Sequence, residues 1–107
     1  MQQLPPAALQ SWMADRSRDR PALLDVREPW EHERCLIAGS VPLPMSQVVD
    51  RAGELDPARE WVVICHHGMR SMQVGMYLER IGFPNVFNLQ GGIDAWAREL
   101  EPGMARY

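Results

Sequence analysis

The residues best suited to chemistry lie in one short segment, Trp61–Ser71, which reads WVVICHHGMRS. Its thiol, Cys65, is followed at short spacing by Gly68 and Arg70. Backbone N–H groups in a tight loop can converge on an anion, and the start of a helix adds partial positive charge. Gly68 permits a positive φ angle, and Arg70 supplies a permanent cation. These features favour the thiolate, the nucleophilic form of cysteine, so we predict that Cys65 is reactive rather than an inert buried residue.

The pattern around Cys65 predicts a strand followed by a helix. No polar side chain occurs in Trp61–Cys65, as expected of a strand buried on both faces of a parallel sheet. After the loop, apolar residues recur with helical period and place Val74, Leu78 and Ile81 on one face. Cys65 is therefore expected at the carboxyl end of a central strand, where open α/β sheets bind ligands.

The rest of the chain alternates strand-like and helix-like segments. Short apolar runs predict further strands at Ala22–Val26, Gly39–Leu43 and Val86–Leu89. Helices are expected to begin at Pro5-Pro6 and after Gly91-Gly92, with an irregular crossover or short helix over Met45–Leu55. This alternation predicts an α/β fold with a central parallel sheet and helices on both faces. We expect one domain, residues 1–107, with a loose tail that ends at Tyr107.

Composition excludes several classes of function. The net charge is −3, which gives no reason to expect a nucleic acid or an anionic membrane as partner. All eleven basic residues are Arg, so neither a Schiff-base lysine nor a phosphate-loop lysine is available. No secretory signal and no apolar run of membrane-spanning length is visible. We therefore expect a cytoplasmic protein.

The two cysteines, Cys35 and Cys65, lie thirty residues apart and match neither a zinc motif nor a disulfide framework. We expect no metal and no cofactor. Cys35 is most simply a small core residue, although a resolving thiol for Cys65 is the alternative.

Asp25 is the polar exception in the Ala22–Val26 strand, and a buried carboxylate requires a partner. Arg27 is not expected to share a strand face with Asp25, so we expect the partner to come from a neighbouring loop. Asp25 either forms a structural ion pair or shapes the floor of the site. The tract Glu28–Glu33 is predicted to be a solvated acidic face.

Three motifs together resemble the rhodanese (sulfurtransferase) domain. Cys65–Ser71 is similar to the active-site loop of that family, Cys-x-x-Gly-x-Arg-Ser. Leu24–Glu28 resembles its N-terminal Asp-x-Arg signature, and Gly91–Trp96 resembles its Gly-Gly-x-x-x-Trp signature. Ile37–Pro44 is a weaker match. The resemblance covers nearly the whole chain, with one departure: Cys35 and Leu36 stand where the family often has Gly-His.

This resemblance implies a rhodanese-like three-layer fold and transfer of sulfane sulfur through a Cys65 persulfide. The donor would be a small molecule such as thiosulfate, and the acceptor would be cyanide, a thiol or a sulfur-acceptor protein. Asp25 and Arg27 would support the site. The residues implied in anion and substrate binding are those of the loop: His66, His67, Gly68, Met69, Arg70 and Ser71.

Three alternatives remain open. Related phosphatases have one residue more between Cys and Arg, whereas four residues separate Cys65 from Arg70. A non-catalytic binding module or a sulfur-relay partner is the second alternative, although such modules usually lack the loop cysteine. The third alternative is a redox protein in which Cys35 and Cys65 form a pair.

Overall fold

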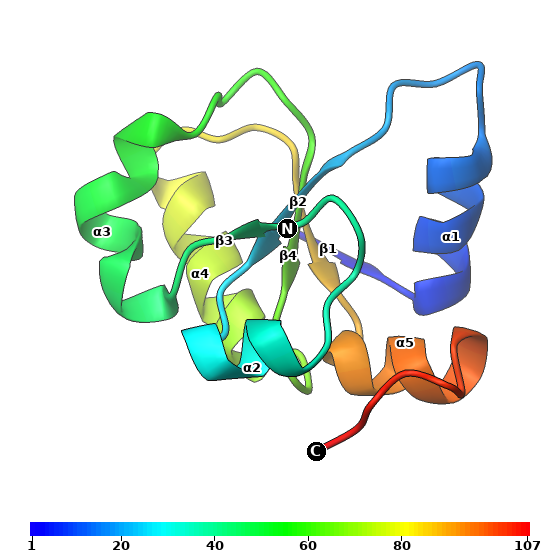
Figure 1. Ribbon diagram of the computed structural model, residues 1–107. Helices are drawn as coiled ribbons and strands as arrows, with labels where there is room; N and C mark the ends of the chain where they lie inside the picture. The colour runs from blue at the N-terminus through cyan, green and yellow to red at the C-terminus, as the bar shows by residue number, and fades with distance from the viewer.

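Five parallel strands form one sheet in the order β1-β5-β4-β2-β3 (Figure 1), in a computed structural model that describes residues 1–107. The strands are β1 (Gln2–Leu4), β2 (Ala22–Asp25), β3 (Val41–Pro42), β4 (Trp61–Ile64) and β5 (Val86–Leu89). The helices are α1 (Pro6–Ala14), α2 (Pro29–Arg34), α3 (Val48–Arg51), α4 (Met69–Arg80) and α5 (Gly92–Leu100). Short 3-10 turns, η1 (Met45–Gln47) and η2 (Ala52–Glu54), flank α3. The predicted α/β fold and the central place of the β4 strand are confirmed.

Helices cover both faces of the sheet, which gives three layers. In Figure 1, α1 and α5 lie on one side, while α3 and α4 lie on the other. Neighbouring residues of β4 point to opposite faces, so Val62 packs in the cluster with α1 and α5, and Val63 packs in the cluster with α3 and α4. Both side chains are fully buried. This two-sided burial explains why β4 reads as a continuous apolar run.

Helix α4 lies close to its predicted position. Val74 and Leu78 are buried against the sheet, as their spacing indicated. The expectation for Ile81 was wrong, because the helix ends at Arg80 and the Ile81 side chain is 45% exposed. Gly82 follows with a φ of 107°, a left-handed conformation that terminates the helix.

Strand β1 was not predicted from the sequence. Gln2–Leu4 pairs with β5 in parallel register, which places Gln3 beside Asn88. The segment is only three residues long, two of them are exposed glutamines, and it lies at the sheet edge. A period-two pattern cannot be detected over so few residues.

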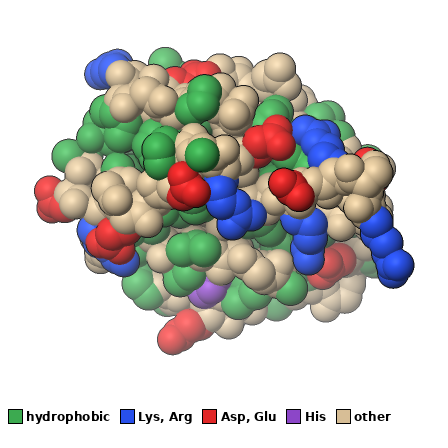
Figure 2. All heavy atoms as spheres, turned by 90° about the horizontal axis from the view of Figure 1, so that it is seen from above, with side chains coloured by type: hydrophobic (Ala, Val, Ile, Leu, Met, Phe, Trp, Pro, Cys, Tyr) green, Lys and Arg blue, Asp and Glu red, His purple; other side chains and the backbone are tan.

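On the face that Figure 2 shows, acidic and basic side chains lie next to one another, and no extended patch carries charge of a single sign. None of the helices combines the length and the apolar character that crossing a bilayer requires.

Gly92, with a φ of 65°, should be the glycine whose replacement costs the most stability. A Cβ at this position would overlap the backbone carbonyl groups of Cys65 and His66, which cannot move away as a flexible side chain can. Gly92→Ala should therefore lower the free energy of unfolding by about 3 kcal/mol or more. Urea denaturation monitored by circular dichroism measures this change.

Gly82→Ala is the matched control. Gly82 also has a positive φ, but nothing lies within 4 Å of a Cβ added there, so only the backbone strain of about 1–2 kcal/mol applies. Equal losses in the two variants would contradict the contact of Gly92 with the Cys65 carbonyl.

Candidate active site

The Cys65 thiol lies directly beyond the carboxyl end of β4 and is 1% exposed. The loop that follows folds back over it, so that Gly68 donates its backbone N–H to Cys65 Sγ at 3.0 Å. The Ser71 hydroxyl oxygen lies 3.2 Å from the same sulfur. Gly68 allows this reversal because its φ is 100°. The structure therefore brings Cys65, Gly68 and Ser71 together, as the sequence spacing predicted.

The start of α4 adds further donors to the loop. The backbone N–H groups of Met69, Arg70 and Ser71 belong to the first turn of a twelve-residue helix, and none donates to another group of the chain. Free amides at a helix start carry partial positive charge and favour an anion. The loop thus has the backbone features of an anion site beside a thiol.

Asn88 in β5 fixes the orientation of this loop. Its side-chain amide donates to the Gly68 carbonyl at 3.2 Å and to Gln3 Oε1 at 2.9 Å. Because a carbonyl can only accept, the Asn88 amide oxygen must face Ser71, and the Ser71 hydroxyl donates to it. Sequence reasoning missed Asn88 and Gln3. The available signal was a single polar residue, 2% exposed, in the buried strand VFNL.

The Gly91-Gly92 segment positions the other side of the loop. Ile93 donates its N–H to the Cys65 carbonyl at 2.8 Å, and Asp94 donates to the His66 carbonyl at 3.1 Å. Gly92 leaves room for this approach because it has no Cβ. The first turn of α5 therefore holds the backbone of the Cys65 loop directly.

Arg70 forms a bidentate ion pair with Glu31 of α2, at 2.7 and 2.9 Å. The Glu31 side chain also accepts the Glu28 N–H at 2.9 Å and the Tyr107 hydroxyl at 2.7 Å. The hydrogen bonds from Arg70 lower the pKa of Glu31 to about 2, against the opposing effect of burial. The prediction of a solvated acidic face was wrong for Glu31, whose side chain is only 3% exposed. The helical period of α2 turns Glu31 towards α4 and away from the exposed residues of the helix.

Asp25 pairs with Arg27, so the expected partner from a neighbouring loop was wrong. Arg27 donates to the two carboxylate oxygens at 2.9 and 2.6 Å. Residues two apart lie on the same side of a strand, and β2 ends at Asp25, which lets the long Arg27 side chain turn back. His32 also donates to Asp25, at 2.8 Å. Burial opposes ionisation of Asp25, but the hydrogen bonds from Arg27 and His32 outweigh it and lower its pKa.

The remaining donors of Arg27 are also occupied. They bind the Glu31 carbonyl at 3.1 Å, the Tyr107 hydroxyl at 2.9 Å and the Cys35 carbonyl at 2.6 Å. Arg27 is 1% exposed. It therefore ties together the chain segments around the site and has no donor left for a small ligand.

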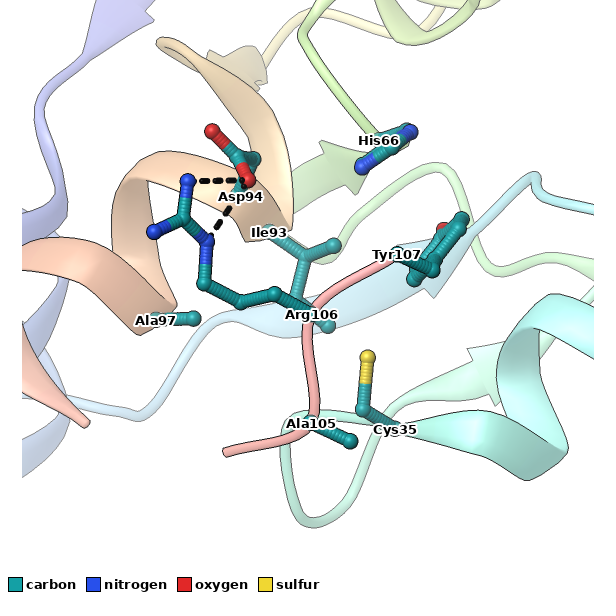
Figure 3. A pocket seen from close by; sticks show the side chains of 8 residues that line it. All are labelled: Cys35, His66, Ile93, Asp94, Ala97, Ala105, Arg106 and Tyr107. Carbon is teal, nitrogen blue, oxygen red and sulfur yellow. Dashed lines mark hydrogen bonds and ion pairs between the residues drawn. The ribbon is translucent and has the colours of Figure 1, made fainter. Parts of the chain in front are cut away.

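Tyr107 lies on the active-site loop, so the expected loose tail was wrong. Its ring stacks on His66 with centroids 4.0 Å apart, and His66 in turn stacks on His67 at 3.9 Å. Figure 3 shows the parallel rings of His66 and Tyr107, and the ion pair from Arg106 to Asp94 beside them. Burial and the neighbouring His67 lower the pKa of His66. The sequence signal was weak, a single aromatic residue in a polar tail.

Three residues with metal-binding side chains gather beside this stack. His66, His67 and Asp94 place one potential ligand atom each within 4.8 Å of one another. The Asp94 carboxylate, however, already binds Arg98 at 3.2 Å and Arg106 at 3.0 Å. A cation at this position would have to compete with two guanidinium groups.

Cys35 lines the pocket drawn in Figure 3, together with His66 and Tyr107. Its thiol is half-buried and, like that of Cys65, is free of any disulfide.

The buried Glu31 carboxylate should make the stability of the protein depend on pH. Its folded-state pKa of about 2 lies below the ordinary value of 4.5, so its stabilisation is present above that value and is lost as the pH falls towards 2. Between about pH 7 and about pH 3, the wild type should lose about 2 kcal/mol more unfolding free energy than Glu31→Gln. Urea unfolding at the two pH values measures this difference. Glu33→Gln, which removes an exposed carboxylate of the same helix, should behave as wild type; identical acid sensitivity of all three proteins would contradict the assignment.

Comparison with known proteins agrees with this geometry. The family model described as Rhodanese-like domain matches residues 6–99. A sulfurtransferase of Allochromatium vinosum is 40% identical over 83 residues, which cover 78% of this chain and 78% of that protein. A Rhodanese-like/PpiC domain-containing protein 12 of Arabidopsis thaliana is 37% identical over 93 residues, 83% of this chain but only 31% of that protein. The crystal structure of a rhodanese-related protein from Thermoplasma volcanium superposes with a TM-score of 0.85 at 30% identity, over 95% of this chain and 96% of that one. The chain belongs to the rhodanese-like domain family.

Proposed function

We propose that this chain is a sulfurtransferase that carries sulfane sulfur as a persulfide on Cys65, with residues 1–107 acting as one catalytic unit. The observation that carries the proposal is the environment of Cys65 Sγ. The sulfur accepts the Gly68 N–H at 3.0 Å and lies beside the free amides of the first turn of α4. Relatives of the chain bear the name sulfurtransferase, as the Allochromatium vinosum protein does.

In the first half-reaction the Cys65 thiolate attacks the outer, sulfane sulfur of the donor. With thiosulfate, the new bond joins Cys65 Sγ to this sulfur, the sulfur–sulfur bond of the donor breaks, and its electron pair leaves with sulfite. The negative charge moves one atom outward, from Sγ to the terminal sulfur of the persulfide. The amides of Met69, Arg70 and Ser71 stabilise this anion in its new position without a metal ion.

In the second half-reaction an acceptor takes the terminal sulfur and restores the Cys65 thiolate. The acceptor is cyanide in an assay, and a small thiol or a sulfur-acceptor protein in the cell. This is covalent catalysis in two steps, in which the first product leaves before the acceptor binds. The Ser71 hydroxyl, whose proton is donated to Asn88, lies 3.2 Å from Sγ and holds the loop against it, while Asp25 and Arg27 hold the surrounding backbone.

Such chemistry requires a thiol that stays reduced between turnovers. Both cysteines are free. We therefore place the reaction in a reducing compartment such as the cytoplasm, where thiols persist and thiol acceptors are abundant.

Cys65→Ala should abolish persulfide formation and leave the fold nearly unchanged, because the exchange removes one sulfur atom from a buried position. Intact-mass spectrometry of reduced protein, before and after thiosulfate or another sulfane donor and again after cyanide, measures the cycle. The wild type should gain the mass of one sulfur atom and lose it with cyanide.

Cys35→Ala is the matched control, since it removes the other thiol of the chain and should retain the adduct. An adduct that persists in Cys65→Ala, or that disappears in Cys35→Ala, would contradict the role of Cys65. A folded wild-type protein that no sulfane donor loads would favour a binding module.

A further inference from the structure

The arginine side chains near Cys65 are all paired with carboxylates of the protein. Arg27 has no free donor and pairs with Asp25. Arg70, which lies within electrostatic reach of Cys65, holds both Glu31 oxygens. On the other side of the loop, two arginines, Arg98 and Arg106, face two carboxylates, Asp94 and Glu99.

The two stacked rings His66 and Tyr107 add no charge to the site. Burial and His67 lower the pKa of His66, so this imidazole is neutral near neutral pH. Burial raises the pKa of Tyr107 to about 12, so its phenol stays protonated and donates to Glu31. Every guanidinium named here is therefore held by a carboxylate of the protein.

Glu31 is a permanent anion of this site. Its carboxylate is 3% exposed and accepts hydrogen bonds from Arg70, from the Glu28 N–H and from the Tyr107 hydroxyl. These bonds fix both its position and its charge. The carboxylate also occupies one edge of the Arg70 guanidinium, the edge that would otherwise bind two oxygens of an oxyanion in the same bidentate geometry.

We propose that Glu31 determines donor specificity by selecting sulfur donors that carry a single negative charge, such as persulfides and thiosulfonates, over the thiosulfate dianion. The proposal rests on the sulfurtransferase function proposed above and names the substrate class of the same site. A dianion would meet a site whose guanidinium groups are already paired, with a fixed carboxylate behind Arg70. A monoanion meets half of that repulsion and still finds the backbone amides of α4.

Two sulfur donors that react in the same way but differ in net charge can test the proposal. Thiosulfate and methanethiosulfonate both transfer an outer sulfur bonded to an oxidised sulfur, but the second carries one charge fewer. In each case the Cys65 thiolate forms a bond to the outer sulfur, and the electron pair of the broken sulfur–sulfur bond leaves with sulfite or with methanesulfinate. The two reactions therefore produce the same persulfide and balance in the same way.

The experiment measures kcat/KM for both donors, with cyanide as acceptor, in the wild type, in Glu31→Gln and in Glu33→Gln. The wild type should prefer methanethiosulfonate by about tenfold or more, and higher ionic strength should narrow this preference. Glu31→Gln removes the fixed anion and frees Arg70, so it should raise kcat/KM about tenfold for thiosulfate but only about threefold for methanethiosulfonate, which meets half of the repulsion. Glu33→Gln removes the same charge from an exposed position on α2 and should keep the wild-type ratio.

A wild-type kcat/KM for thiosulfate equal to or higher than that for methanethiosulfonate would overturn the proposal. An equal change of kcat/KM for both donors in Glu31→Gln would also overturn it, because Glu31 would then only position the loop. If Glu31→Gln does not fold, the wild-type donor ratio and its salt dependence decide. Failure of the sulfurtransferase function itself looks different, because then neither donor loads sulfur on Cys65.

Discussion

The hydrogen bond from the Gly68 N–H to Cys65 Sγ is the contact around which the site is organised. It requires the chain to reverse within three residues after β4, and such a loop needs support from outside. Asn88 holds the Gly68 carbonyl from β5, and the first turn of α5 holds the Cys65 carbonyl through Ile93. The parallel sheet makes this possible, because the carboxyl ends of adjacent strands meet at one edge.

A second layer of order comes from paired charges. Asp25, Arg27, Tyr107, Glu31 and Arg70 form one continuous hydrogen-bonded chain that joins β2, α2, α4 and the C-terminal segment. Buried ion pairs of this kind add little net stability, because desolvation offsets their attraction. Their effect here is geometric: they hold a guanidinium and a phenol at fixed positions beside the loop and leave no charge unpaired.

The sequence predicted what depends on local pattern. Local pattern alone placed Cys65 at the end of a strand. The signals were the apolar run of β4, the glycine at position 68 and the helical period that follows it. What the sequence could not show are contacts between segments that lie far apart in the chain. Asn88 binds the Gly68 carbonyl, 20 residues away in sequence, and Tyr107 binds Glu31, 76 residues away. Glu31 was misjudged because charge alone does not reveal which face of a two-turn helix meets a partner.

Reactivity and selectivity rest on different groups in this arrangement. Backbone amides of the loop can stabilise an anion on sulfur whatever donor supplied it, because they recognise charge at one point. Discrimination between donors must then come from side chains around that point. Arg70 belongs to the loop itself and keeps donors to spare beside its ion pair, and its Glu31 partner limits how much negative charge it can attract. Under the proposed function, a change at Glu31 would thus alter which donors are used and leave the proposed persulfide chemistry at Cys65 unaltered.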